Sequence, residues 1–135
     1  MKVPHMAHVA LVDGHRFLLT RNSGQMFQPR LEKLREIQLE PTNFSAGIRN
    51  QDSASQRKGS TDLNELAHGA AAADWLNRKV LAGEIEHLLV VADPKTLGEM
   101  RRHYHKELED RIVAELPKAL TRETIPDIER AIAAA

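Results

Sequence analysis

Two aspartates stand at positions where carboxylate chemistry could be built. Asp13 follows the apolar run HVALV and precedes a glycine, and Asp93 follows the run LLVVA and precedes a proline. Short apolar runs of this kind are typical of strands buried in an α/β sheet, where sites usually lie at the carboxyl ends of strands. If these two strands are neighbours, the carboxylates could share Mg²⁺ or Mn²⁺, as in nucleases with a ribonuclease-H-like sheet.

A shared metal ion needs further ligands, and the sequence supplies none at a diagnostic spacing. Asp62 and Asp74 are the nearest candidates for a third carboxylate. His103 and His105 lie two residues apart, so on a helix they would point about 200° away from each other. The chain has no cysteine and none of the common nucleotide, zinc-protease or hydrolase motifs. We therefore predict no metal site and no cofactor, with turn and helix-entry roles as the alternative for Asp13 and Asp93.

Length and composition predict a single domain over residues 1–135. The 135 residues suffice for one hydrophobic core, and 41% hydrophobic with 28% charged residues is ordinary for a soluble protein. No apolar run approaches the roughly 18–20 residues of a membrane span. The amino-terminal segment is a poor signal peptide, because polar residues interrupt its apolar stretch. We expect a cytoplasmic protein with no membrane insertion, and its oligomeric state is open.

The first part of the chain predicts a β-meander. Residues 8–12 read as a strand buried on both faces, and Asp13-Gly14 is a strong hairpin-turn signal. Residues 16–20 then form the returning strand, and alternation over residues 33–39 predicts a third.

Residues 41–62 change in character and predict a long, flexible polar loop. Ser, Thr, Asn, Gln, Asp and Gly dominate this segment, and loops beyond about 12–15 residues are usually functional or disordered. The net charge of zero hides a +4 balance in residues 1–60 and −4 in residues 61–135. Arg49, Arg57 and Lys58 in the loop are therefore the candidate partner-binding residues. The aromatic content of 4% argues against a base-stacking surface, and an idle linker is the alternative for the loop.

The second part of the chain alternates helices with strands. The predicted elements are a helix from Thr61 or Asp62 to Gly83, a strand over 87–92, a helix capped by Thr96, a charged connector over 106–110, a strand over 111–116 and a helix over 125–133. A strand that follows a helical crossover usually lies parallel to an earlier strand. The predicted fold is α/β, with a mixed sheet of about five strands in the order β-β-β-loop-α-β-α-β-α.

Three segments resemble the bacterial host attachment protein family: VALVDGHRFLL near the start, LLVVADPKTLGEMR in the middle, and RIVAELPKALTRETIPDIERAI at the end. The closing segment is the most specific, since Leu120-Thr121 and Pro126 to Glu129 stand where the family has "DLT…P…EIE". That family is similar to the middle domain of archaeal and eukaryotic peptide-chain release factors and to Pelota-like ribosome-rescue factors. The resemblance implies a release-factor middle-domain-like fold.

In release factors the loop after the early strands carries a Gly-Gly-Gln tip that triggers peptidyl-tRNA hydrolysis. The corresponding residues 41–62 contain Gly47 and Gly59, and neither is followed by glutamine. Ser23-Gly24-Gln25 resembles the tripeptide but falls in an earlier loop. The resemblance therefore does not carry over termination activity.

The leading hypothesis is a non-enzymatic host-attachment family protein that acts indirectly. It would bind ribosomal RNA, the ribosome or a regulatory protein through the long loop. A metal-dependent nuclease or hydrolase that uses Asp13 and Asp93 is the second hypothesis. A structural protein-interaction module is the third.

Overall fold

The computed structural model describes residues 1–39 and 56–135, and of residues 56–63 only the backbone. The described residues form one mixed sheet in the order β3-β2-β1-β4-β5. The strands are β1 (His8–Val12), β2 (Phe17–Asn22), β3 (Leu31–Glu36), β4 (Leu88–Ala92) and β5 (Ile112–Leu116). The helices are α2 (Gln56–Leu81), α3 (Pro94–Arg101), α4 (Lys106–Arg111) and α5 (Ile125–Ala134). The α/β class with a five-stranded mixed sheet is confirmed.

The centre of the sheet is the parallel pair of β1 and β4. Both strands run in the same direction in register, from His8 opposite Leu88 to Val12 opposite Ala92. All of β4 and all of β1 except its first residue are buried. Continuous apolar runs fit this place because helices cover both faces of the pair. The predicted parallel crossover is confirmed.

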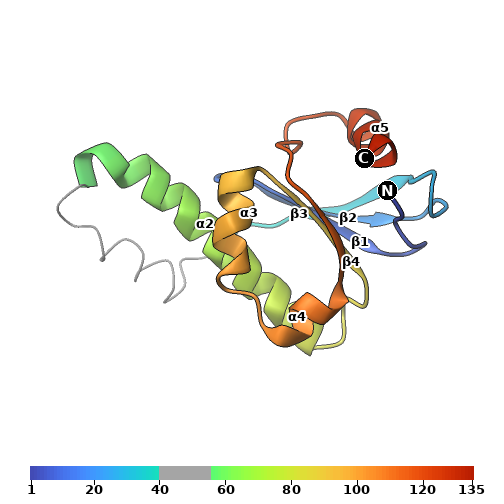
Figure 1. The fold of residues 1–135 in the computed structure, drawn as a ribbon, viewed down its shortest axis with the longest axis horizontal. Helices are drawn as coiled ribbons and strands as arrows, with labels where there is room; N and C mark the ends of the chain where they lie inside the picture. The colour runs from blue at the N-terminus through green and yellow to red at the C-terminus, as the bar shows by residue number, and fades with distance from the viewer. Residues whose placement is uncertain (40–55) are drawn as a thin grey trace.

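The helices lie on the two faces of the sheet. Figure 1 shows α2, α3 and α4 on one face and α5 on the other. Side chains along β1 alternate between the two cores, because successive strand residues point to opposite faces. Ala10 and Val12 join the core under α2 to α4, whereas Val9 and Leu11 join the core under α5.

The long helix α2 is positioned by small residues and a defined stop. Ala70, Ala72 and Ala73 are fully buried, and a Cβ at Gly69 would lie 3.3 Å from a Thr96 methyl group, so α2 approaches the sheet and α3 closely. The helix ends at Leu81, two residues before the predicted stop at Gly83, whose φ of +77° suits glycine. No helix of the described residues is long and apolar enough to cross a membrane.

Two predicted boundaries are wrong. Helix α2 begins at Gln56 rather than at Thr61 or Asp62, so the predicted 41–62 loop is wrong over residues 56–62, while residues 41–55 lie outside the described part. Residues 56–62 carry almost no apolar residues, so no apolar periodicity indicated a helix there. The helix can still extend over them, because lengthening a formed helix is far easier than nucleating one. The charged connector over 106–110 is helix α4, which His105 caps by accepting from the Glu107 N–H at 3.0 Å.

Smaller differences concern the strand ends. Strand β3 occupies Leu31–Glu36 rather than residues 33–39. Its pairing with β2 already begins at Leu31, which lies opposite Asn22, and ends at Glu36, which lies opposite Leu18. The observed order is β-β-β-α-β-α-α-β-α, with one helix more than the sequence predicted.

Candidate functional site

The carboxyl ends of β1 and β4 meet at one edge of the sheet, so the adjacency that a shared carboxylate site would require is present. Val12 and Ala92 are paired, and Asp13 and Asp93 each follow directly. We call the residues around this point the carboxylate edge: Asp13, His15, Glu65, His68, Asp93, Lys95 and Thr121.

The Asp13 carboxylate is engaged in holding the β1–β2 turn. Its Oδ1 accepts from the backbone N–H of His15 at 2.7 Å and of Arg16 at 2.6 Å. Its Oδ2 accepts from the Thr121 hydroxyl, which belongs to the segment before α5. Partial burial favours the neutral acid, but the hydrogen bonds from Thr121 and the turn outweigh it and lower the pKa of Asp13. This carboxylate is therefore charged and satisfied by protein donors.

Asp93 has an equally clear local role. Asp93, and not Thr96 as predicted, is the N-cap of α3. Its Oδ2 accepts from the Thr96 N–H at 3.2 Å, and Pro94 begins the helix. Aspartate before a helical proline is a strong helix start. Both aspartates thus directly follow adjacent strands, and each carboxylate already accepts hydrogen bonds from nearby protein groups.

Helix α2 packs against the same turn through charged and polar contacts. His68 Nδ1 lies 2.7 Å from the Asp13 carbonyl oxygen. Since a carbonyl only accepts, Nδ1 carries the proton, and burial lowers the pKa of His68 and keeps the ring neutral. Glu65 is 3.2 Å from His15 Nε2 and 3.7 Å from Lys95 Nζ. A Cβ at Gly14 would lie 2.4 Å from Glu65 Cγ, so only glycine fits beneath α2 there.

The carboxylate edge gains no further metal ligands from the described residues. Across residues 1–39 and the side chains from residue 64 onward, no group of three or more His, Asp or Glu could hold a metal ion. Asp74 pairs with Arg78 at 3.4 Å along α2, and the side chain of Asp62 lies outside the description. His103 faces Glu99 at 3.3 Å while His105 caps α4, so these two histidines do not converge.

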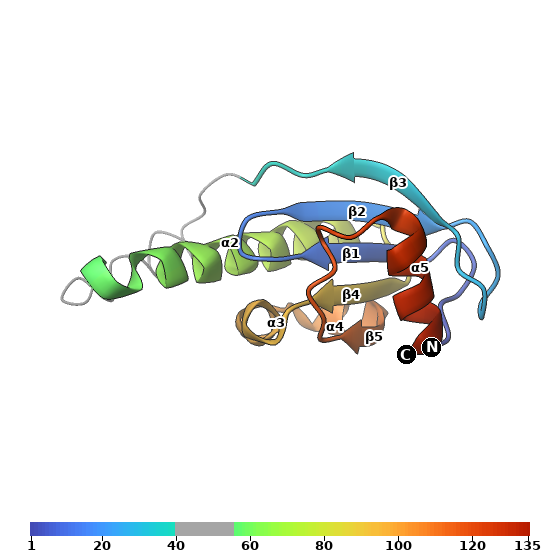
Figure 2. The same cartoon turned by 90° about the horizontal axis from the view of Figure 1, so that it is seen from above.

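The candidate partner-binding residues lie at the far end of α2. Arg57 and Lys58 belong to its first turn, and Arg49 lies outside the described residues. A helix of 26 residues is about 39 Å long, roughly twice the length of a five-residue strand. Figure 2 shows the start of α2 extending well beyond the sheet. The backbone thus carries these two cations away from the body of the sheet.

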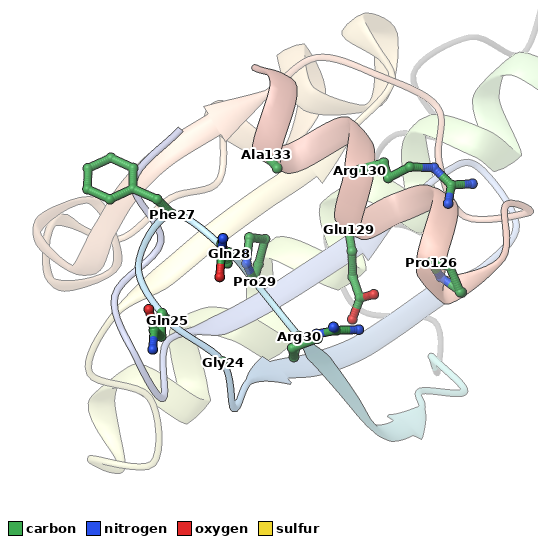
Figure 3. Close-up of a pocket in the computed structure, with 10 residues that line it drawn as sticks. All are labelled: Gly24, Gln25, Phe27, Gln28, Pro29, Arg30, Pro126, Glu129, Arg130 and Ala133. Atoms are coloured by element: carbon green, nitrogen blue, oxygen red, sulfur yellow. The ribbon is translucent and has the colours of Figure 1, made fainter.

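A groove at the opposite end of the sheet was missed by sequence reasoning. It has a volume of about 570 Å³ and lies between the β2–β3 loop and α5. Figure 3 shows Gly24 and Gln25 of that loop, from the Ser23-Gly24-Gln25 tripeptide, on its wall. Glu129 of α5 joins the two walls by accepting from the Leu31 N–H at 2.6 Å. These partners are 98 residues apart, so no local pattern could have shown the groove.

The five-stranded mixed sheet, with a long crossover helix on one face and a closing helix on the other, is an α/β domain whose fold is consistent with a release-factor-like domain. The sequence model of the bacterial archaeo-eukaryotic release factor family 12 matches residues 6–132. The chain belongs to this family. No curated protein matches the chain. The predicted relation to release-factor domains is therefore confirmed, and the match does not confirm the narrower host-attachment naming.

Proposed function

We propose that this chain is a non-enzymatic binding domain of the translation apparatus. It contacts the ribosome or its RNA through the segment that joins β3 to α2 and through the start of α2. Arg49, Arg57 and Lys58 supply the cations. The observation that carries the proposal is the release-factor family match, which spans nearly the whole chain.

The shape of α2 supports this assignment. The helix extends its first turns, to which Arg57 and Lys58 belong, beyond the sheet (Figure 2). Cations bind nucleic-acid phosphates by releasing counterions, which needs no built pocket. The carboxylate edge, by contrast, holds mostly groups that contact one another.

The residue types favour binding over catalysis. Residues 41–62 contain no Gly-Gly-Gln, the tripeptide with which release factors trigger hydrolysis of peptidyl-tRNA. Asp13 and Asp93 are taken up by a turn and a helix cap. We therefore assign the domain recognition of the translation apparatus without peptide release.

The attachment phenotype implied by the sequence resemblance fits this proposal as an indirect effect. A cytoplasmic protein that binds ribosomes or a regulatory protein would alter surface properties of the cell through the proteins it helps to produce. The proposal therefore does not make this chain an adhesin.

Ribosome co-sedimentation tests the proposal. The triple variant Arg49→Gln, Arg57→Gln, Lys58→Gln is compared with the parent chain at about 50 and 200 mM salt, a range over which a few phosphate contacts cost about tenfold in affinity. We expect the parent chain to pellet with ribosomes at low salt and the variant to stay in the supernatant.

A matched control removes the same number of charges elsewhere. Lys106, Lys118 and Arg122 are exposed cations on the carboxyl-terminal part of the chain, and their triple glutamine variant should pellet like the parent. Absence of parent binding, or equal loss in the two variants, would contradict the proposal.

The second candidate is a metal-dependent nuclease or hydrolase, favoured by the adjacency of the two strand-end aspartates. Asp93→Asn separates the candidates, because asparagine keeps the helix cap and removes the carboxylate. Cleavage of RNA that requires Mn²⁺ and disappears in this variant would establish the second candidate. Our proposal predicts no such cleavage by the parent chain.

A further inference from the structure

The β2–β3 loop is a preorganised wall of the groove. The fully buried Asn22 accepts through its Oδ1 from the N–H groups of Gly24 at 2.9 Å and Arg30 at 3.0 Å. Its amide donates to the Val3 carbonyl at 2.9 Å. The Gly24 position has no room for a side chain, since a Cβ would lie 2.6 Å from the Gln28 carbonyl oxygen. One buried amide thus ties the two ends of the loop together, and backbone hydrogen bonds between Gln25 and Gln28 close its tip.

This fixed loop presents apolar side chains to solvent at its tip. Phe27 is 62% exposed and Met26 is 41% exposed. The aromatic content of 4% argues against an extended base-stacking surface, but a single exposed ring can stack one base. Phe17 is fully buried in the core, so exposure is not general among the described phenylalanines. An aromatic ring that a rigid backbone holds in water offers its face to a ligand at little ordering cost.

The polar lining of the groove is largely without partners. Within residues 1–39 and the described part of 56–135, the Arg30 guanidinium and the side-chain amides of Gln25 and Gln28 have no hydrogen bond or ion pair. Arg130 is 72% exposed and pairs with Asp127 in the same helix, an arrangement that contributes little and yields readily to another anion. The Glu129 carboxylate is already engaged by Leu31.

These groups are spread along the groove. Figure 3 shows Phe27 at the rim of one end, with its ring directed outward, Gln28 in the middle, and Arg30 and Arg130 toward the other end. A volume of about 570 Å³ is within the range of sites that enclose small organic ligands. From one end to the other, the groove therefore offers a flat aromatic face, side-chain amides that can donate and accept hydrogen bonds, and cations.

We propose that this groove binds single-stranded RNA. One base stacks on Phe27, the Gln25 and Gln28 amides meet base edges, and Arg30 with Arg130 binds the adjoining phosphates. Unpaired bases offer a π-face together with hydrogen-bonding edges, whereas a segment of acidic residues has no π-face. The choice of RNA rests on the proposed function, but the surface is a second one, at the end of the sheet opposite the start of α2 (Figure 2).

Fluorescence anisotropy with a labelled ten-residue oligouridylate tests the proposal at low salt. Phe27→Ala should weaken binding about tenfold, the loss expected for one stacked base. Phe27→Tyr should restore binding, because it keeps the stacking face. Arg30→Gln should weaken binding and reduce the salt dependence by about one phosphate contact.

Matched controls make the result specific to the groove. Val113 is 40% exposed on β5, so Val113→Ala removes a comparable exposed apolar side chain from another edge. Circular dichroism checks that every variant is folded. The proposal fails if the parent chain does not bind, if Phe27→Ala binds like the parent, or if Val113→Ala loses as much. It also fails if polyglutamate competes as well as unlabelled RNA, which would identify an acidic protein segment as the occupant.

The two proposals fail separately. The Arg49, Arg57 and Lys58 triple variant enters the same anisotropy assay. Adding Phe27→Ala to this triple variant should still weaken its binding to the oligouridylate. Ribosome binding that needs the triple set, together with a Phe27→Ala variant that binds RNA normally, removes the groove proposal alone. Phe27-dependent RNA binding without ribosome co-sedimentation removes the proposed function alone.

Discussion

The two ends of the sheet treat their polar side chains in opposite ways. At the carboxylate edge, Asp13, Glu65 and His68 bind one another, the backbone or neighbouring side chains. At the groove, the described contacts leave the polar ends of Arg30, Gln25 and Gln28 without partners. Polar groups that satisfy each other stabilise the fold, whereas unpartnered groups on a rigid wall are available for recognition. The rule that α/β sites lie at the carboxyl ends of strands points to the carboxylate edge. The observed contacts instead favour the groove as the place of recognition.

The largest effect should come from the residue that builds the groove wall. Asn22→Ala removes a buried hydrogen bond to the Val3 carbonyl and partly buried ones from the Gly24 and Arg30 N–H groups. We expect the free energy of unfolding in urea to fall by about 3 kcal/mol. Asn64→Ala, at an exposed position of α2, is the matched control and should change little. A loss below about 0.5 kcal/mol would mean that the loop is not held by Asn22.

A smaller loss should follow at the carboxylate edge. Thr121→Val removes the hydroxyl that donates to Asp13, and should cost about 1–2 kcal/mol at neutral pH. The folded pKa of Asp13 is lowered, so the stability it contributes is present above its unfolded pKa near 4 and disappears as the pH falls through the folded value. The gap between Thr121→Val and the parent should therefore close in acid. Thr121→Ser keeps the donor, and an equal loss there would contradict the role of the hydroxyl.

His68, a residue of α2, should add a pH dependence of its own. Burial lowers the folded pKa of His68 below its unfolded value near 6.5, so the unfolded chain binds the extra proton first and stability decreases as the pH falls below about 6.5. His68→Gln keeps an amide donor for the Asp13 carbonyl and should make this decrease shallower. Urea unfolding between about pH 7 and 5 measures the slope, with exposed His87→Gln as the control. Parallel curves for His68→Gln and the parent would contradict the burial effect.

The smallest effect on stability should come from the exposed ring of the groove. Phe27→Ala should change the free energy of unfolding by no more than about 0.5 kcal/mol, because surface substitutions rarely do more. A loss above about 1.5 kcal/mol would mean that the ring packs against the domain, and the groove would then lack its stacking face.

The sheet centre could be predicted from sequence, and the distant contacts could not. The apolar runs before Asp13 and Asp93 and the intervening helix were enough to predict β1, β4 and the parallel pairing of β4 with an earlier strand. Helix α4 was missed because its cap is His105, a residue seldom read as a helix start. The partner of Asp13 is Thr121, 108 residues away, and the groove depends on a contact between Leu31 and Glu129. Contacts of this range leave no local periodicity, so they appear only after the chain has folded.

The central claim is that this release-factor family domain binds ribosomes through the start of α2 and the segment before it, and not through the carboxylate edge. One gradient co-sedimentation at low salt compares the Arg49, Arg57 and Lys58 triple glutamine variant with Asp93→Asn. We predict that Asp93→Asn pellets with ribosomes like the parent chain and that the triple variant remains unbound. Loss of binding in Asp93→Asn with full binding in the triple variant would contradict the account.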